Sequence, residues 1–341
     1  MGHAGTPARL GERGLIELVQ RRAGTPGGGW RIGIGDDGAV LRPRAGHDLV
    51  LSTDSMVEDV HFRWSTTDAR SLGIKVLASA LSDLSAMGAR PLGFLLSLGL
   101  PGDAPAARLE GFLRGLLGEA RRAGCPLVGG DTVASPHWSL ALSVTGEVPR
   151  GRCLRRSAAR PGDRLMVTGT LGAAALGLAL LERGRAGRKG AAAFVRRQLR
   201  PRPPLEVGPH LVRAKLARAA IDLSDGLSLD LDRMLRASRV GARIELDRLP
   251  LAPGLHTHAA ALGLDALSLA LHGGEDYELL FAVAPGAPSA AALGRRLGCR
   301  VTELAVLERG RSARYEHRGE RVAITAHGYD HFKRPATQSD K

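Results

Sequence analysis

Residues 51–63 read LSTDSMVEDVHFR, a stretch in which an expected strand ends in oxygen-bearing side chains. Leu49 and Leu51 alternate with polar or smaller neighbours, and residues 48–57 contain no Pro or Gly, which predicts a strand. The oxygen-bearing residues that follow are Ser52, Thr53 and Asp54. Hard cations such as Mg²⁺ prefer oxygen ligands of this kind. The alternative is an N-cap or turn, but similar Asp-bearing turns recur along the chain and favour a cation site.

Length and composition predict a soluble protein of two domains. Of the 341 residues, 44% are hydrophobic and 24% charged, which are ordinary values for a globular chain. The three cysteines lie far apart without CxxC spacing, which indicates a reducing compartment and neither a disulfide framework nor a zinc site. The sequence has no signal-peptide core, and its longest apolar runs, 92–100 and 173–181, are too short to span a bilayer. We expect a cytoplasmic protein with no membrane partner.

The net charge of +14 raises the possibility of a nucleic-acid partner. The arginines, however, are spread over nearly every expected helix, and only three Trp and three Tyr are available for stacking on bases. The excess of Arg over Lys, with abundant Ala and Gly, is typical of a biased genome composition. We therefore expect no nucleic-acid partner.

A second Asp-bearing turn lies upstream, in GIGDDGAV at residues 33–40. Its glycines allow sharp bends and close approach to a ligand. Asp36 and Asp37 are adjacent carboxylates that repel each other, so a bound cation would account for them, and a solvated hairpin turn is the alternative. The sequence contains no GxxxxGK[ST] phosphate loop.

The expected helix 71–88 is apolar on most sides and should be buried. Its polar remainder is a narrow stripe at near-helical spacing: Lys75, Ser79, Ser82 and Asp83. A buried Asp83 needs a partner, which could be Lys75 two turns earlier or a metal ion.

The rest of the first half predicts an α+β arrangement, in which strand, helix, strand, helix and strand follow one another. After the strand at 48–57 and the helix at 71–88, we expect strand 93–100, helix 106–123, strand 127–128 and strand 138–148. The short strand ends in Gly129, Gly130, Asp131 and Thr132, which again places an acidic residue after glycines. A helix at 11–22 precedes this series.

The basic, Pro- and Gly-rich segment 150–162 predicts a domain junction. Its Arg155 and Arg156 could grip a phosphate bidentately or be ordinary surface charges. Beyond it we expect strand 164–168 and helices 173–183, 191–199 and 207–216.

The stretch AIDLSDGL at 220–227 is an apolar strand that ends in another Asp-bearing turn. Asp222 and Ser224 share one face of that strand. Asp225 can cap the helix expected at 227–238, but capping leaves Asp222 unexplained. Two later blocks carry the remaining signals, HGGEDYELLFAV at 272–283 and GYDHF at 328–332.

Taken in order, these blocks resemble the thiamine-monophosphate kinase family, within the group of ATP-dependent synthetases that resemble aminoimidazole ribonucleotide synthetase. The matching blocks are GIGDDGAV, STD followed by VHF, SDLSAMGARP, GGDT, RRSAARPGD, DLSDGL, GGEDYEL and GYDHF. They extend from about residue 31 to residue 332, so the resemblance covers most of the chain.

The resemblance implies an α/β (α+β) fold of two domains like that of aminoimidazole ribonucleotide synthetase, with the active site in the cleft between them. Residues 1–150 would form a mixed sheet with helices, bind ATP and Mg²⁺, and pair with a second copy as a dimer barrel. Residues 151–334 would form an α/β sandwich, and residues 335–341 a disordered tail. The reaction implied is the final step of thiamine diphosphate biosynthesis, the ATP-dependent phosphorylation of thiamine monophosphate by a homodimer.

The resemblance also implies the site residues. Several Mg²⁺ ions would be held by Asp37, Ser52, Thr53, Asp54, Asp83, Asp131, Asp222 and Asp225. ATP would contact Gly130, Asp131, Arg156 and Ser224, and the acceptor would contact His61, Glu275 and Tyr329. Asp36 remains an alternative to Asp37, and Arg155 an alternative to Arg156. The sequence departs from the family in having Arg114 where an aromatic residue is common, and Val133-Ala134 where a second Thr and a basic residue are common.

The chemistry agrees with this set of residues. The accepting phosphate oxygen is already ionised at neutral pH, so neither a general base nor a covalent nucleophile is expected. The obstacle is repulsion between two polyanions, about 4 kcal/mol for two unit charges 4 Å apart at an effective dielectric of 20. Several Mg²⁺ ions would remove that repulsion and align the substrates.

The alternative within the same superfamily is an enzyme that activates a different acceptor, such as an amide, a carboxylate or selenide. A selenide enzyme would need a reactive Cys or Lys near the N-terminus, and residues 1–30 contain neither.

Overall fold

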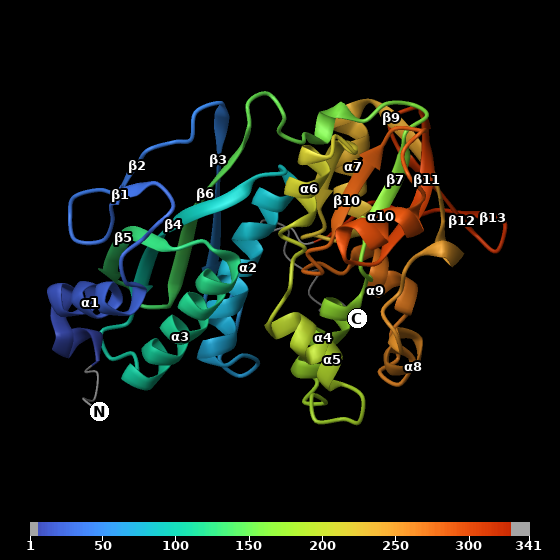
Figure 1. Ribbon diagram of the computed structural model, residues 1–341. Coiled ribbons are helices and arrows are strands. Elements are labelled where there is room, and N and C mark those ends of the chain that lie inside the picture. Colours follow the sequence, from blue (N-terminus) through green and yellow to red (C-terminus); the bar gives the residue numbers. More distant parts are fainter. Residues whose placement is uncertain (1–5, 329–341) are drawn as a thin grey trace.

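Most strands form two large sheets, one in each half of the chain, and β1 and β2 pair separately (Figure 1). The computed structural model describes residues 6–328. Its strands are β1 (Trp30–Ile32), β2 (Val40–Leu41), β3 (His47–Val57), β4 (Arg90–Leu100), β5 (Leu127–Ala134), β6 (Ser139–Pro149), β7 (Arg164–Thr168), β8 (Ala217–Asp222), β9 (Val240–Glu245), β10 (Leu279–Val283), β11 (Val301–Arg309), β12 (Ala313–His317) and β13 (Glu320–Val322).

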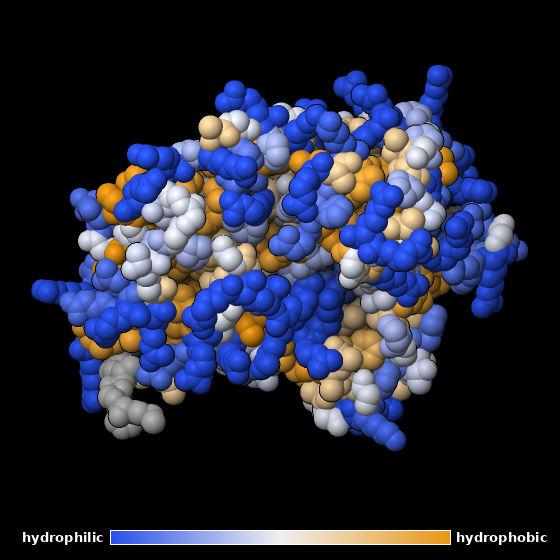
Figure 2. Space-filling view, viewed as in Figure 1, coloured by the Kyte–Doolittle hydropathy of each residue, from blue (hydrophilic) through white to orange (hydrophobic). Residues whose placement is uncertain are grey.

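The helices are α1 (Pro7–Ala23), α2 (Ala69–Ala86), α3 (Ala106–Ala123), α4 (Ala173–Glu182), α5 (Ala192–Leu199), α6 (Val207–Arg213), α7 (Leu227–Ser238), α8 (Leu255–Ala260), α9 (Ala266–His272) and α10 (Ala290–Leu297), with short 3₁₀ turns η1 (Arg156–Ala158) and η2 (Leu246–Arg248). In the described part of the chain no helix is long and apolar enough to cross a membrane. Figure 2 shows hydrophilic residues over much of the face seen there, with apolar residues exposed in small groups.

The N-terminal sheet is mixed and has the order β3-β6-β4-β5, with α2 and α3 packed on one face (Figure 1). Strands β4 and β5 are parallel, and the other pairs are antiparallel. Because side chains alternate along a strand, every second side chain points toward the helices, and the others point to the opposite face of the sheet, called the open face below. Large apolar side chains on that open face remain exposed, among them Leu51 at 72%, Val133 at 52% and Leu95 at 42%.

The C-terminal sheet has the order β13-β12-β9-β11-β7-β10-β8 and is antiparallel except for the β12–β9 pair. The two halves share an apolar cluster, because α2 packs against α5, α6 and β8 as well as against its own sheet. Leu81 and Leu84 of α2 belong to the same cluster as Leu211 and Phe281 of the C-terminal half. Helix α2 therefore lies between the two sheets, apolar on most sides as its sequence predicted.

Several predicted elements match the structure and some do not. The bounds predicted for α3, β7 and α7 are those observed. The predicted end of β5 at residue 128 was wrong, because the strand continues through the glycines and Asp131 alongside β4. Helix α1 begins at Pro7, but its backbone is kinked at Gly11, the predicted start, where φ is 64°. Helix α6 ends at Arg213 rather than 216, because Lys215 has a left-handed backbone with φ of 55°.

Candidate active site

Strand β3, the last turns of α2 and the turn η1 bring four residues of the predicted site together. The Ser52 hydroxyl donates a hydrogen bond of 2.5 Å to Oδ2 of Asp83. Burial raises the pKa of the Asp83 carboxyl, the bond from Ser52 lowers it, the charge of Asp54 raises it and that of Arg156 lowers it. Asp54 and Arg156 therefore lie close enough to Asp83 to act on its charge.

The polar stripe of α2 faces residues of the C-terminal half. Lys75 Nζ lies 2.6 Å from Oε1 of Glu275, and the Ser82 hydroxyl donates a 2.9 Å hydrogen bond to Oδ2 of Asp222. Lys75 was one of the two partners expected for the Asp83 carboxylate, but it pairs with Glu275 instead. Eight residues of helix separate Lys75 from Asp83 by about 12 Å, whereas the loop before β10 comes directly against Lys75.

Asp222 is the most deeply buried of the predicted ligands whose placement is described, with 3% of its surface exposed. Its pKa is raised to about 7, first by burial and then by the charges of Asp83 and Asp230. The bond from Ser82 and the charge of Arg156 lower it less. Carboxylates held this close repel one another, and a divalent cation would relieve that repulsion.

Asp225 lies at the start of α7 and is engaged by two residues that the sequence reading missed. Arg233 Nη1 contacts Oδ2 of Asp225 at 2.5 Å and Oδ1 of Asp230 at 2.7 Å. The backbone N–H of Asp225 donates to Oδ2 of Asp230 at 3.0 Å. Burial raises the pKa of Asp230 to about 6. An acidic residue three positions before an arginine on an amphipathic helix was the signal available for this pair.

The alternation of the strands divides the predicted metal ligands between the two faces of the N-terminal sheet. Ser52 and Asp54 point toward α2, on the same face as Leu142 and Leu96. Thr53 points to the open face, and so does Asp131, which pairs in register with exposed Ser97 of β4.

Asp37 also belongs to the open face. Its loop lies against β5, where a Cβ added to Gly129 would lie 4.0 Å from that of Ala39. Strands β3 and β5 are the two edges of this sheet, about 14 Å apart. Between residues 6 and 328 no three His, Cys, Asp or Glu side chains converge closely enough to hold a metal ion as they stand.

Two family models match the chain. One, described as AIR synthase related protein, N-terminal domain, matches residues 35–148, and the corresponding C-terminal domain matches residues 160–315. The thiamine-monophosphate kinase of Escherichia coli K12 is 42% identical over 311 residues, which are 89% of this chain and 93% of that protein. The chain belongs to the thiamine-monophosphate kinase family.

Solved structures agree with this membership. The crystal structure of thiamine-monophosphate kinase from Stenotrophomonas maltophilia K279a superimposes with a TM-score of 0.80 at 36% identity, covering 90% of this chain and 96% of that one. A structure described as AaThiL complexed with AMPPCP and TMP has a TM-score of 0.75 at 30% identity and covers 97% and 100% of the two chains. The predicted two-part α/β fold of the thiamine-monophosphate kinase family is confirmed.

The residues that the family resemblance assigns to ATP lie on three elements. Gly130 of β5 is required as glycine, since a Cβ there would lie 1.9 Å from the carbonyl oxygen of Leu96. Ser224 follows β8, and its carbonyl oxygen accepts the N–H of Glu275 at 2.8 Å. Arg156, in η1, is the arginine whose charge lowers the pKa values of Asp83 and Asp222.

Of the residues assigned to the acceptor, the structure describes two. The His61 ring accepts the Val57 N–H at Nδ1, 3.0 Å away, which fixes the ring beside the end of β3. Glu275 has a left-handed backbone with φ of 67°, an uncommon conformation for a residue with a Cβ. Tyr329 and the tail predicted to be disordered lie outside the described residues. Arg114, which replaces the family's aromatic residue, lies on the exposed side of α3.

Proposed function

We propose that this chain transfers the γ-phosphoryl group of ATP to thiamine monophosphate, giving ADP and thiamine diphosphate. One observation carries the proposal: the charge of Asp54 acts on Asp83, that of Asp83 acts on Asp222, and that of Arg156 acts on both, in a chain of the thiamine-monophosphate kinase family. The relative AaThiL is complexed with AMPPCP and TMP, and AMPPCP is an analogue of ATP. Both substrates of the proposed reaction therefore have counterparts on that protein.

The carboxylate cluster fits a site for Mg²⁺. The donors are all oxygen atoms, from Ser52, Asp54, Asp83 and Asp222, and burial and mutual repulsion raise the pKa values of Asp83 and Asp222. When bound, Mg²⁺ would neutralise the charge that builds up between the two phosphate chains. Asp225 could bind a cation of this cluster only if its ion pair with Arg233 were broken.

The chain's own residues then bind and orient the substrates. Arg156 faces the cluster and is suited to hold a phosphate of ATP. Glu275 and His61 would position the acceptor, whose phosphate oxygen attacks the γ-phosphorus directly while ADP leaves. No proton has to be removed from that oxygen, so we assign no general base and no covalent nucleophile.

The activity is tested with purified protein, MgATP and thiamine monophosphate in an ADP-release assay. We expect ADP and thiamine diphosphate in equal amounts, and no turnover when EDTA is added. With chiral γ-phosphate-labelled ATP, a single in-line step inverts the configuration at phosphorus. ADP release that is indifferent to thiamine monophosphate would rule out the acceptor, and retention of configuration would rule out direct transfer.

We also propose that a second copy of the chain completes the site. Asp131, Thr53 and Asp37 are on the open face of the N-terminal sheet, away from Asp54. The same face exposes Leu49, Leu51, Leu95 and Val133, which is typical of a surface that packs against a partner. Two open faces packed about a two-fold axis would bring the β5 edge of one copy toward the β3 edge of the other.

Subunit complementation tests this arrangement. Asp54→Asn and Asp131→Asn should each be inactive alone. In a reassociated mixture, half of the dimers are mixed and one of their two sites is intact, so about a quarter of wild-type activity should return. No recovery in a mixture shown by mass spectrometry to contain mixed dimers would contradict a shared site. The cytoplasmic location, the domain division at residue 150 and the absence of nucleic-acid or membrane partners stay predictions.

A further inference from the structure

The loop before β10, residues 273–278, concentrates features that oppose folding stability. Glu275 and Tyr277 both have positive φ angles, 67° and 49°, which residues with a Cβ adopt at a cost. Lys75 of α2, which faces this loop, is 5% exposed within a largely buried helix. Burying a lysine is unfavourable unless its ammonium group is paired. Such costs collected in one place indicate a functional constraint on the loop.

The carboxylate of Glu275 is held at both of its oxygens. Lys75 Nζ lies 2.6 Å from Oε1, and Gln198 of α5 donates from Nε2 to Oε2 at 2.6 Å. Only the amide nitrogen of Gln198 can donate to a carboxylate, so this contact fixes the orientation of the amide. Its Oε1 is then buried without a hydrogen-bond partner among residues 6–328. The glutamine therefore satisfies Glu275 at the expense of its own carbonyl oxygen.

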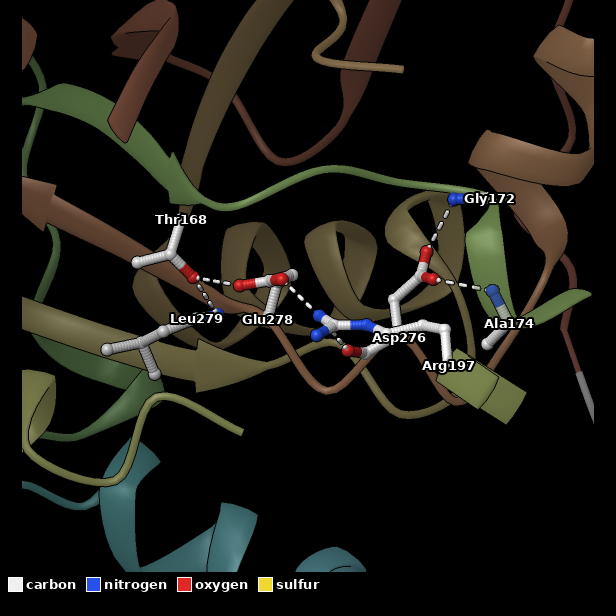
Figure 3. Close-up of polar contacts among 7 residues, drawn as sticks. All are labelled: Thr168, Gly172, Ala174, Arg197, Asp276, Glu278 and Leu279. Carbon is white, nitrogen blue, oxygen red and sulfur yellow. Dashed lines mark hydrogen bonds and ion pairs between the residues drawn. The ribbon is translucent and has the colours of Figure 1, made fainter. Parts of the chain in front are cut away.

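The backbone of the same loop is clamped by the neighbouring residue of α5 (Figure 3). Arg197 donates to the carbonyl oxygen of Asp276 at 3.0 Å and pairs with the carboxylate of Glu278. The Asp276 carboxylate accepts the N–H groups of Gly172 and Ala174 at the start of α4. The loop is thus fixed directly after Glu275, and the strained backbone directs that side chain toward α2.

We infer that Lys75 and Gln198 are positioning residues that fix the Glu275 carboxylate for the acceptor substrate. They come from different halves of the chain, so the carboxylate is correctly placed only when α2 and α5 are docked together. Glu275 in turn contacts the acceptor in the proposed function, on which this inference rests. Neither Lys75 nor Gln198 is among the residues assigned to ATP, so their loss should affect acceptor binding selectively.

The test compares Gln198→Ala and Lys75→Met with Arg196→Ala, which removes an exposed arginine of the same helix α5. At saturating MgATP, both variants should raise the KM for thiamine monophosphate about tenfold or more, since each loses a hydrogen bond to a charged group. The KM for ATP should stay within about twofold of wild type, and Arg196→Ala should match wild type in both. Equal increases in the two KM values would overturn the inference.

A double-mutant cycle separates positioning from general packing. If Gln198 acts through Glu275, Gln198→Ala should raise the KM little further once Glu275→Ala is present. Fully additive effects would overturn the inference. Gln198→Ala removes the unsatisfied oxygen together with the rest of the amide, so we expect this variant to fold. It therefore keeps the test valid even if Lys75→Met does not fold. A wild-type protein that ignores thiamine monophosphate would refute the proposed function instead, which distinguishes the two failures.

Discussion

Two groups of buried carboxylates lie within this molecule, and their surroundings differ. Asp276 and Glu278 each have at least two polar partners (Figure 3). Asp276 accepts two backbone N–H groups, and Glu278 pairs with Arg197 and accepts the Thr168 hydroxyl at 2.6 Å. Asp83 and Asp222 each accept one serine hydroxyl, and the guanidinium of Arg156 is the positive charge that acts on both.

The difference separates carboxylates with a structural role from carboxylates with a functional role. Donors around a buried carboxylate compensate for its burial, so removing one of them destabilises the fold, whereas carboxylates that face one another with few donors repel unless a ligand binds. The first group holds the loop that carries Glu275. We place the cations and phosphates at the second group. Substitutions in the first group should therefore lower stability, and substitutions in the second should lower turnover.

The largest expected effect is on turnover. Asp222→Asn should lower kcat by about 10²–10³-fold, because it removes a ligand that acts on the developing charge. Its melting temperature without ligands should equal or exceed that of wild type, because the repulsion with Asp83 and Asp230 is lost. The measurements are ADP release and thermal unfolding on the same preparation. Near-normal turnover at saturating Mg²⁺ would show that the cluster is misplaced.

The second prediction concerns the guanidinium of each group. Arg197→Ala should lower the free energy of unfolding by about 3–5 kcal/mol, because it leaves Glu278 buried without its charged partner. Arg156→Ala should change it by about 0.5 kcal/mol or less, since Arg156 is exposed. Urea denaturation of both variants beside wild type measures the contrast. Equal destabilisation by Arg197→Ala and Arg156→Ala would contradict the difference proposed between the two carboxylate groups.

The last prediction is a pH dependence of stability due to Asp276. Burial raises its pKa to about 7 from an ordinary value of 3.8. Between these pH values the unfolded chain has released a proton that the folded protein retains, so the unfolding free energy falls as pH rises through this window.

Asp276→Asn cannot titrate and should lose that part of the pH dependence, on the order of 3–4 kcal/mol between pH 4 and 8. It should also be less stable than wild type at every pH, because an amide has one acceptor oxygen for the two N–H groups of Gly172 and Ala174. Urea midpoints at several pH values check both points. A pH profile parallel to that of wild type would contradict the assignment.

The sequence by itself determined the family and much of the local structure. The blocks from GIGDDGAV to GGEDYEL identified the thiamine-monophosphate kinases, and the periodicity around α3, β7 and α7 predicted those elements to the residue. It also predicted that α2 is buried with a narrow polar stripe. These properties follow from residues close together in the chain, where helical and strand periods can be counted.

Only the tertiary structure decided which of those residues meet. Lys75 pairs with a glutamate 200 positions later, and Asp225 with Arg233 rather than with the rest of the cluster. Ser52, Thr53 and Asp54 are consecutive, yet the pleat of β3 sends Thr53 to the open face and its neighbours toward α2. Motif order assigns residues to a site, but the pairing of strands and the docking of α2 determine the face and the partner of each side chain.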